Sequence, residues 1–339
     1  MRYVKIIDEL YNDYCKLLPL DLADEKDAEK INTWKNDIRY SQADFARLLN
    51  ILCTSTSLDE FVKGSGGDFD NLAGIVKVAV MSGVVTISKS GSITANDEKL
   101  KTISIDSDQL NTGITPNADY NQFPCDEESA DRRAKYILSR HPYTKSLKVG
   151  LIGDDDFISL RFLNLPTIST IVIEKDERII DTIRQAKEDS DTFIIEQDVR
   201  EITSSYDIDT FVTDPPYTFD GSLAFIVCGL SMMGEQKGKE FYVILNPTMM
   251  GSRLFRLIEV LAQNGITVIN IEKNISNYRL PGNFSERHRA DKFLEELGID
   301  GKSLQYSSSS TMYTFFTKTN VDTNKLRKFL SEDKIYEHY

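Results

Sequence analysis

Apolar and polar positions follow two different patterns along the chain, and the change falls near residue 130. Before it, apolar side chains recur at three- and four-residue spacings, as at Phe45, Leu48, Leu49 and Leu52, which is typical of amphipathic helices. After it, short apolar runs of strand length alternate with helical patterns. Regular alternation of strands and helices predicts an α/β domain with a mostly parallel sheet.

The first part, residues 1–110, is predicted to be a small helical domain that ends in a β-hairpin. Ser41 has the features of a helix N-cap, and Gly91 lies in a turn between two short β-branched runs. Helices followed by a hairpin predict a winged-helix-like domain. The helix that would read DNA offers only Lys77 to phosphates or bases, so we expect dimerisation or covering of an active site instead. The predicted helices are 4–18, 27–34, 42–52 and 71–81, and the predicted hairpin strands are 84–88 and 92–94.

The second part, residues 131–325, is predicted to be the α/β domain that contains this mostly parallel sheet. A polar linker, 111–130, precedes it and is expected to contribute to the active site, and a tail, 326–339, follows. In such sheets, ligands bind beyond the carboxyl ends of the strands. The predicted strands are 148–152, 168–173, 192–195, 210–212, 242–245 and 266–271, and the predicted helices are 127–139, 157–162, 177–188, 223–233 and 251–263.

The charge balance narrows the class of partner. The chain has 339 residues, with 53 acidic against 40 basic ones, so its formal net charge is −13. Nucleic-acid binders gain much of their affinity from Lys and Arg on phosphates, so this balance argues against a nucleic-acid partner and favours a cationic substrate. No apolar run approaches the roughly 18 residues of a membrane span, and the first residues lack a signal core. We therefore expect a cytoplasmic protein.

Cysteine and histidine are few and scattered. The chain has four cysteines and three histidines, and none of them are spaced as a metal-ligand pair. We expect reduced structural thiols and no metal requirement.

Three aspartates in a row follow the first predicted strand of the second part, in Gly153-Asp154-Asp155-Asp156, which we name the acidic turn. Nucleotide-binding folds usually place several glycines here, so that backbone N–H groups can approach an anion. Three carboxylates would instead repel a phosphate or carboxylate and attract an ammonium group. We expect the dipole of the predicted helix 157–162 to keep them ionised. An acidic N-cap run on a solvated helix is the alternative.

Two further acids follow the next two predicted strands. Glu174 lies 21 residues after Gly153, at the spacing of the acid that accepts hydrogen bonds from ribose hydroxyls in nucleotide-binding folds. Asp198, after the third strand, could accept from an adenine amino group. The alternative for both is a surface acid at a strand end.

The fourth predicted strand leads into Asp214-Pro215-Pro216-Tyr217, which we name the proline turn. Two prolines remove two N–H donors and fix the backbone, which leaves carbonyl and carboxylate acceptors beside an aromatic ring. Such a cluster suits an amine, because it can hold the N–H bonds and accept a proton. A plain turn after a strand is the alternative, as it is for the aromatic and amide cluster of Tyr120, Asn121 and Gln122 in the linker.

Taken in order, these motifs resemble those of the N4-bis(aminopropyl)spermidine synthases, the branched-chain polyamine synthases. The motifs are Tyr120-Asn121-Gln122, the acidic turn, Glu174-Lys175-Asp176-Glu177-Arg178, Asp198-Val199-Arg200 and Asp214-Pro215-Pro216-Tyr217-Thr218. The resemblance implies transfer of the aminopropyl group of decarboxylated S-adenosylmethionine to an amine of a polyamine such as spermidine. The products would be a branched polyamine and methylthioadenosine. It also implies that residues 131–325 form a Rossmann-like catalytic domain of the methyltransferase type. Within this domain it assigns catalysis and polyamine binding to Asp154, Asp155 and Asp156.

The chain departs from the family pattern at three places. Asn121 stands where the family has Asp, which removes one charge contact to the polyamine, and Glu174 stands where the family often has Asp. The family's tail is acidic, whereas residues 325–328 are basic here.

We assign the predicted site as follows. Asp156 is our first choice for the catalytic proton acceptor, with Asp214 and Asp155 as the other catalytic candidates, and the Pro215 carbonyl is expected to orient the nitrogen. The cofactor-binding residues are predicted to be Gly153, Asp154, Glu174, Asp198 and Pro215, and the substrate-binding residues Tyr120, Gln122, Asp155, Pro216 and Tyr217. We expect a homodimer.

Two other functions remain open from the sequence. An S-adenosylmethionine-dependent amino-methyltransferase of nucleic acid would account for the proline turn, though not for the acidic turn or the net charge. A non-catalytic winged-helix regulator that senses adenosyl compounds is the third reading, though it would not need reactive side chains in both turns.

Overall fold

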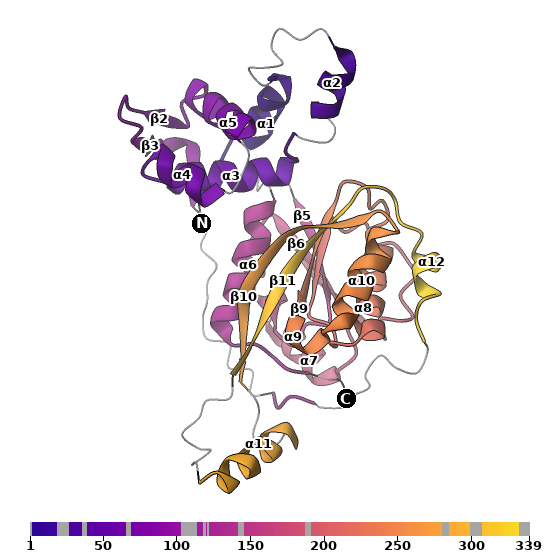
Figure 1. Ribbon diagram of the computed structural model, residues 1–339. Helices are drawn as coiled ribbons and strands as arrows, with labels where there is room; N and C mark the ends of the chain where they lie inside the picture. Colours follow the sequence, from indigo (N-terminus) through magenta and orange to yellow (C-terminus); the bar gives the residue numbers. More distant parts are fainter. Residues whose placement is uncertain are drawn as a thin grey trace. The chain divides into compact units, whose positions relative to one another are not determined.

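The computed structural model describes residues 2–18, 27–35, 39–65, 69–102, 114–117, 120, 122–141, 146–186, 191–279, 285–298 and 307–331. It divides into two compact units, one of residues 1–104 with 135–146 and one of residues 105–134 with 147–339 (Figure 1). The helix α6 (Glu127–Arg140) begins in the second unit and ends in the first. Asn121 and residues 332–339 of the predicted tail lie outside the described residues.

The first unit is helical, with two small antiparallel sheets. β2 (Val85–Ile87) pairs with β3 (Ile93–Ala95), which confirms the predicted hairpin, and β1 (Arg2–Val4) pairs with β4 (Leu100–Thr102), which was not predicted. The Ser41 hydroxyl accepts a hydrogen bond from the Asp44 N–H at 3.2 Å and caps α3, as predicted. The helices of this unit, besides the short turn Asp97–Lys99, are α1 (Ile7–Lys16), α2 (Ala28–Thr33), α3 (Gln42–Thr54), α4 (Leu58–Ser65) and α5 (Phe69–Met81).

The second unit contains a seven-stranded sheet in the order β10-β11-β9-β8-β5-β6-β7. The neighbours from β7 to β9 are parallel, and β11 is antiparallel to both β9 and β10, which confirms the predicted mostly parallel sheet. The chain runs outward from β5 on one side and from β8 on the other, so the order of strands reverses between these two. The strands are β5 (Leu147–Ile152), β6 (Ile168–Glu174), β7 (Thr192–Glu196), β8 (Thr210–Thr213), β9 (Glu240–Leu245), β10 (Ile266–Arg279) and β11 (Ser307–Thr317).

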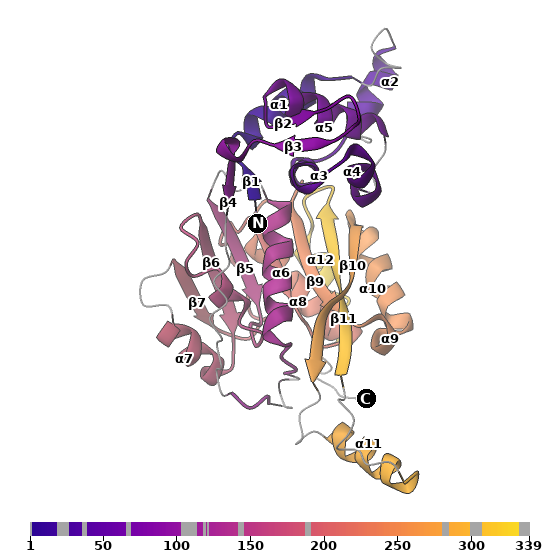
Figure 2. The ribbon, with the colours of Figure 1, turned by 90° about the vertical axis from the view of Figure 1, so that its left-hand side faces the viewer.

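Helices cover both faces of this sheet. All residues of β8 and β9 are buried, as expected for central parallel strands that are packed on both sides. In Figures 1 and 2, the first half of α6 lies on one face, and α8 (Phe219–Met232) and α10 (Ser252–Ala262) lie on the other. The remaining helices are α7 (Glu177–Ala186), which packs on β6 and β7, α9 (Pro247–Met250), α11 (Ser285–Glu296) and α12 (Thr323–Arg327).

The differences from the prediction in this unit include a shortened helix and a missed strand. The helix predicted over 157–162 is only a four-residue 3₁₀ turn, η5 (Ile158–Arg161), preceded by Phe157 with φ +52°. The strand β11 was missed because it opens with four serines and has no clear apolar alternation. In the basic stretch 325–328, the Arg327 guanidinium donates to the carbonyls of Arg200 and Ile202 at 2.9 and 2.5 Å, so this charge anchors α12.

Candidate active site

The acidic turn and the proline turn lie side by side at the carboxyl ends of two paired strands. Ile152 of β5 is paired with Thr213 of β8, and the next residue in each strand begins a turn. Gly153 has φ +71°, and a Cβ placed on it would come within 3.0 Å of the Phe225 ring. Glycine is therefore required there by both the backbone conformation and the packing.

Asp154 points into its own turn. Its carboxylate accepts hydrogen bonds from the backbone N–H groups of Ile158, at 2.8 Å, and Ser159, and it is almost fully buried. Burial raises the pKa of this carboxyl to about 8, although the hydrogen bonds from the turn oppose the shift. Asp154 thus stabilises η5, and its oxygens are turned to the backbone.

For Asp154 and Asp155, the prediction that a helix dipole keeps the acidic turn ionised is wrong. A four-residue 3₁₀ turn has little macrodipole, and burial raises the pKa values of both Asp154 and Asp155. For Asp155, the neighbouring charges of Asp156, Asp214 and Glu174 raise the pKa further.

A buried arginine joins the two turns. Arg133, on the first half of α6, is 0% exposed. Its guanidinium donates to Oδ2 of Asp156, to Oδ2 of Asp214 at 2.7 Å, and to Oγ of Ser276 at 2.6 Å. Because guanidinium stays protonated in proteins, this side chain places a fixed positive charge between two carboxylates.

Two tyrosines complete the arrangement around Asp214. The Tyr278 hydroxyl, from β10, donates to Oδ2 of Asp214, and the Tyr217 hydroxyl donates to Oδ1 at 3.3 Å. Tyr278 also lies 2.9 Å from Oγ of Ser310 in β11. Burial raises the pKa of Asp214 to about 6, although the charge of Arg133 opposes the shift.

The end of the linker closes over the acidic turn. The Phe123 N–H donates to Oδ2 of Asp155 at 3.1 Å, and the Cys125 N–H donates to Oδ1 of Asp156 at 2.5 Å. Asp155 is half-buried, and among the described residues none forms an ion pair with it. Of Asp155, Asp156 and Asp214, Asp155 is therefore the one without a fixed cation.

Glu174 lies at the end of β6, beside the acidic turn. Its carboxylate accepts from the Asp154 N–H at 3.1 Å, and from the N–H groups of Lys175 and Asp176 at 2.7 and 2.9 Å. Burial raises its pKa, and these backbone hydrogen bonds oppose the shift. A carboxylate has about four acceptor positions, so three such bonds leave room for one further donor.

The residues that follow Glu174 hold the linker in place. Gln122 donates to Oδ2 of Asp176 at 2.7 Å and accepts from Arg178 at 3.2 Å, and Arg178 also donates to the Thr115 carbonyl at 3.0 Å. The Lys175 ammonium lies 5.9 Å from the centre of the Tyr120 ring. Tyr120 and Gln122 therefore lie at the end of β6, with the Gln122 amide bonded to protein groups.

Asp198 lies at the end of β7 and is paired with cations. It accepts from Arg200 at 2.8 and 2.7 Å and from the Lys175 ammonium at 3.1 Å. Burial would raise its pKa, but the hydrogen bonds from Arg200 and Lys175 outweigh it and lower the pKa. The carboxylate therefore stays ionised.

Sequence reasoning missed Arg133, Tyr278, Ser276 and Ser310, which lie far along the chain from the two turns. One signal was present for Arg133. It occupies the same helical face as Ala130, Ala134 and Ile137, all of which are buried. A charged residue in an apolar stripe indicates a buried partner of opposite charge.

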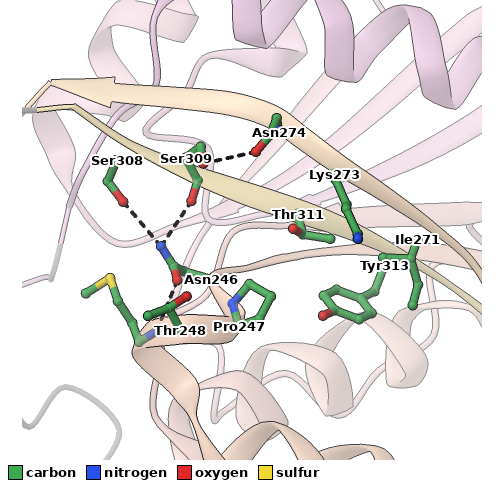
Figure 3. Close-up of a pocket in the computed structure, with 11 residues that line it drawn as sticks. Asn246, Pro247, Thr248, Ile271, Lys273, Asn274, Ser308, Ser309, Thr311 and Tyr313 are labelled. Atoms are coloured by element: carbon green, nitrogen blue, oxygen red, sulfur yellow. Dashed lines mark hydrogen bonds between the residues drawn. The ribbon is translucent and has the colours of Figure 1, made fainter.

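A separate pocket lies beyond the end of β9 (Figure 3). Its volume is about 660 Å³, and the Asn246 amide donates to Oγ of Ser308 and to the Ser309 carbonyl at 3.2 and 3.0 Å. Ser309 and Thr311 alternate with Ser310 along β11, so the pocket faces away from Arg133. It has no acidic lining residue and one cation, Lys273, so it does not suit a cationic ligand.

In the part of the chain that the structure describes, no helix has the length and apolar character to cross a bilayer. Within the same residues, no group of three or more His, Cys, Asp and Glu side chains is arranged to hold a metal ion.

The model of the branched-chain polyamine synthase A C-terminal domain family matches residues 114–336, which is more than half of the chain. No curated protein sequence is significantly similar to the chain.

Among solved structures, the branched-chain polyamine synthase of Thermus thermophilus, in complex with N4-aminopropylspermidine and 5′-methylthioadenosine, is 17% identical. Its TM-score is 0.51, and the alignment covers 92% of this chain and 95% of that one. The C9 mutein of the same synthase, with the same ligands, gives 18% identity, a TM-score of 0.52 and coverages of 92% and 96%. A putative RNA methyltransferase from Pyrococcus horikoshii is 14% identical, with a TM-score of 0.47. The alignment covers 62% of this chain and 93% of that one. The two synthase structures share the fold of this chain.

Proposed function

The chain belongs to the branched-chain polyamine synthase family, and we propose that it transfers an aminopropyl group from decarboxylated S-adenosylmethionine to an amine of a polyamine such as spermidine. The products would be a branched polyamine and methylthioadenosine. The observation that carries the proposal is the pairing of the acidic and proline turns into one cluster of three carboxylates around a single buried arginine.

The charge of this cluster fits the substrates. Asp155, Asp156 and Asp214, when ionised, carry three negative charges, and Arg133 offsets one of them. A polyamine is cationic, and so is a sulfonium donor that has lost its carboxylate. Intact S-adenosylmethionine would bring a carboxylate toward this cluster and be repelled. The net charge of −13 would help to draw both cations in.

We assign the proton acceptor to Asp155 in preference to Asp156, our first choice from the sequence. Asp156 and Asp214 are each paired with Arg133, so a fixed cation already occupies their oxygens. Asp155 is half-buried, has a raised pKa and faces no fixed cation.

The proposed step is an in-line displacement. The secondary amine loses a proton to Asp155, its nitrogen forms a bond to the aminopropyl carbon next to sulfur, and the carbon–sulfur bond breaks. Its electron pair goes to sulfur, which gives neutral methylthioadenosine. The Pro215 carbonyl orients the nitrogen, and Pro216 and Tyr217 form the wall beside it. Asp214 stabilises the cationic amine rather than taking its proton.

For the donor, we propose a site at the ends of β5, β6 and β7. Gly153 lacks a Cβ and lets the adenosyl group approach the backbone, and Glu174 has one acceptor position left for a ribose hydroxyl. Asp198 stays ionised beside Arg200 and could accept from the adenine amino group. Asp154 contributes indirectly, by holding η5 and the turn in shape.

For the acceptor, the Thermus thermophilus synthase offers a guide, since it was solved with N4-aminopropylspermidine and 5′-methylthioadenosine. We propose that Tyr120 and Gln122 line the acceptor side. The linker 111–130 then contributes to the site, which is supported by the bonds from Phe123 and Cys125 to the acidic turn.

We further propose that the first unit is a winged helix and that the enzyme is a cytoplasmic homodimer. The isolated antiparallel β-bridge between Ser57 and Ser92 supports the winged helix. A winged helix has a short strand before the second of its three helices, and Ser57 lies directly before α4. Free thiols at all four cysteines support a reducing compartment. Ile269 and Ile271, which are exposed on the sheet-edge strand β10, support self-association.

The function is tested by supplying the protein with spermidine and either decarboxylated or intact S-adenosylmethionine. Methylthioadenosine and a polyamine heavier by one aminopropyl group are expected from the decarboxylated donor alone. Methyl transfer, to spermidine or to nucleic acid, with S-adenosylhomocysteine as the only nucleoside product, would replace the proposal by an amino-methyltransferase.

A further inference from the structure

We propose that Arg133 is a positioning residue that sets the charge of the site, so that the bound acceptor amine can become neutral while Asp156 and Asp214 stay fixed in place. The inference rests on the proposed aminopropyl transfer and deepens it. Arg133 does not touch the reacting atoms, and it acts through the two carboxylates that it bridges.

The site makes opposing demands on the acceptor amine. An amine must lose a proton before it attacks, yet each neighbouring carboxylate stabilises its protonated form. Three unopposed carboxylates would bind a polyamine tightly and hold its nitrogen as an unreactive ammonium ion. A fixed cation nearby reduces this stabilisation, because like charges disfavour a second protonated group.

Arg133 is held in the site as such a fixed cation. It is completely buried, and five contacts hold its guanidinium: Asp156, Asp214, Tyr278 and Ser276 as hydrogen-bond partners, and the face of the Tyr278 ring at 5.7 Å. Its partners are turn and strand residues that are distant from it in sequence. A guanidinium that bridges two carboxylates also fixes their orientation, which a lysine cannot do with one nitrogen.

Charged and titratable groups face Arg133 and the two turns that it joins. These groups are Asp155 and Asp156 from the acidic turn, Glu174 from β6, Asp214 and Tyr217 from the proline turn, Cys125 from the linker and Tyr278 from β10. Burial raises the pKa values of Cys125, Tyr217 and Tyr278 well above their ordinary ranges, so these three stay neutral. Arg133 is therefore the one permanent cation of this group.

The test uses Arg133→Met and Arg133→Lys, with Arg161→Met and Arg161→Lys as matched controls. Arg161 is also buried and pairs with Asp131 of α6 at 2.8 Å, and among the described residues no ion pair joins it to Asp155, Asp156 or Asp214. The readout is kcat/KM for spermidine from pH 6 to 10. For Arg133→Met we expect the rising limb of the pH profile of kcat/KM to move to higher pH by about one unit or more. The loss of kcat/KM at pH 7 should then exceed the loss at pH 10 by about tenfold or more.

For Arg133→Lys we expect the limb to stay near its original pH while the rate falls about tenfold at every pH, because the charge remains and the bridge is lost. The Arg161 variants should lower the unfolding temperature without moving the limb. An equal loss for Arg133→Met at every pH, or the same profile for both Arg133 variants, would overturn the inference and leave a structural role.

A second measurement does not depend on turnover. Calorimetry in buffers of different ionisation enthalpy gives the protons released when spermidine binds to the protein with methylthioadenosine. The native protein should release more protons than Arg133→Met at pH 8, and equal release would overturn the inference. If the native protein binds spermidine and releases protons as expected but forms no methylthioadenosine, the proposed function fails while the charge-setting role of Arg133 stands.

Discussion

Tyr278 donates its hydroxyl proton to the carboxylate of Asp214, 64 positions earlier in the chain. The bond connects β10, at the far end of the sheet order, to the proline turn after β8. The same hydroxyl accepts from Arg133 at 2.6 Å and lies 2.9 Å from Ser310, so one side chain ties β10, β11 and α6 to the proposed site.

Replacing Tyr278 by Phe removes this hydroxyl and keeps the ring. A hydrogen bond to a charged group contributes about 1.5–3 kcal/mol, so we expect kcat to fall roughly 10- to 100-fold. Steady-state kinetics with spermidine checks this. Tyr313→Phe is the control, because Tyr313 is a buried tyrosine of β11 that faces the separate pocket. A rate for Tyr278→Phe equal to that of the control would argue against a role in the site.

Asp154→Asn and Asp155→Asn should behave differently although the residues are adjacent. Asn caps helical turns about as well as Asp, so Asp154→Asn should keep most of the activity. Asp155→Asn removes the proposed base, and we expect a loss of about 100- to 10,000-fold in kcat. Single-turnover kinetics measures both. Comparable losses in the two variants would contradict the roles assigned to them.

Asp155 should also make stability depend on pH. Its pKa is raised in the folded protein, so folding favours its protonated form, and this stabilisation is present at low pH and lost as the pH rises through the folded-state value. Asp155→Asn removes the cost of ionising a buried carboxyl. The variant should therefore unfold at a higher temperature than the native protein at pH 8, with a smaller difference at pH 4. Scanning calorimetry at both pH values measures the two unfolding temperatures. A gain in unfolding temperature of the variant that is larger at pH 4 than at pH 8 would show that the pKa shift has the opposite sign.

Gly153→Ala should destabilise the fold more than a comparable change elsewhere. It puts a side chain on a left-handed residue and brings a Cβ within 3.0 Å of Phe225, for a total cost of about 2–4 kcal/mol. Gly238 also has a positive φ, of +80°, but no atom lies within 4 Å of the position that a Cβ would take there, so Gly238→Ala should cost only about 1–2 kcal/mol. Urea unfolding of both variants tests the difference, and equal costs would mean that the contact with Phe225 relaxes freely.

The periodic elements of the second unit could be predicted because each has a strong local pattern. The strands β5, β6 and β8 are apolar runs bounded by turn residues, and the motifs that follow them lie at their carboxyl ends as expected. β11 could not be predicted in this way. Its buried face includes Ser310 and Thr314 beside Met312, so polar groups that bond within the protein replace the apolar signal.

The charge states of the site could not be predicted from local sequence, because they depend on residues brought together by the fold. Asp156 looked like the best base while Arg133 was unseen, 23 positions earlier on a helix of mostly polar composition. Likewise the expected helix dipole after Asp156 required a longer helix than the four-residue 3₁₀ turn that the structure has there. The motifs could be identified from the sequence, whereas the separate roles of the aspartates could be assigned only from the tertiary contacts.

The most direct test of the central claim is a competition between donors. The protein is incubated with spermidine and equal concentrations of decarboxylated and intact S-adenosylmethionine, and mass spectrometry follows the nucleoside and amine products. We predict methylthioadenosine together with aminopropylated spermidine, with S-adenosylhomocysteine below about one hundredth of it. Predominant S-adenosylhomocysteine with a methylated product would contradict aminopropyl transfer.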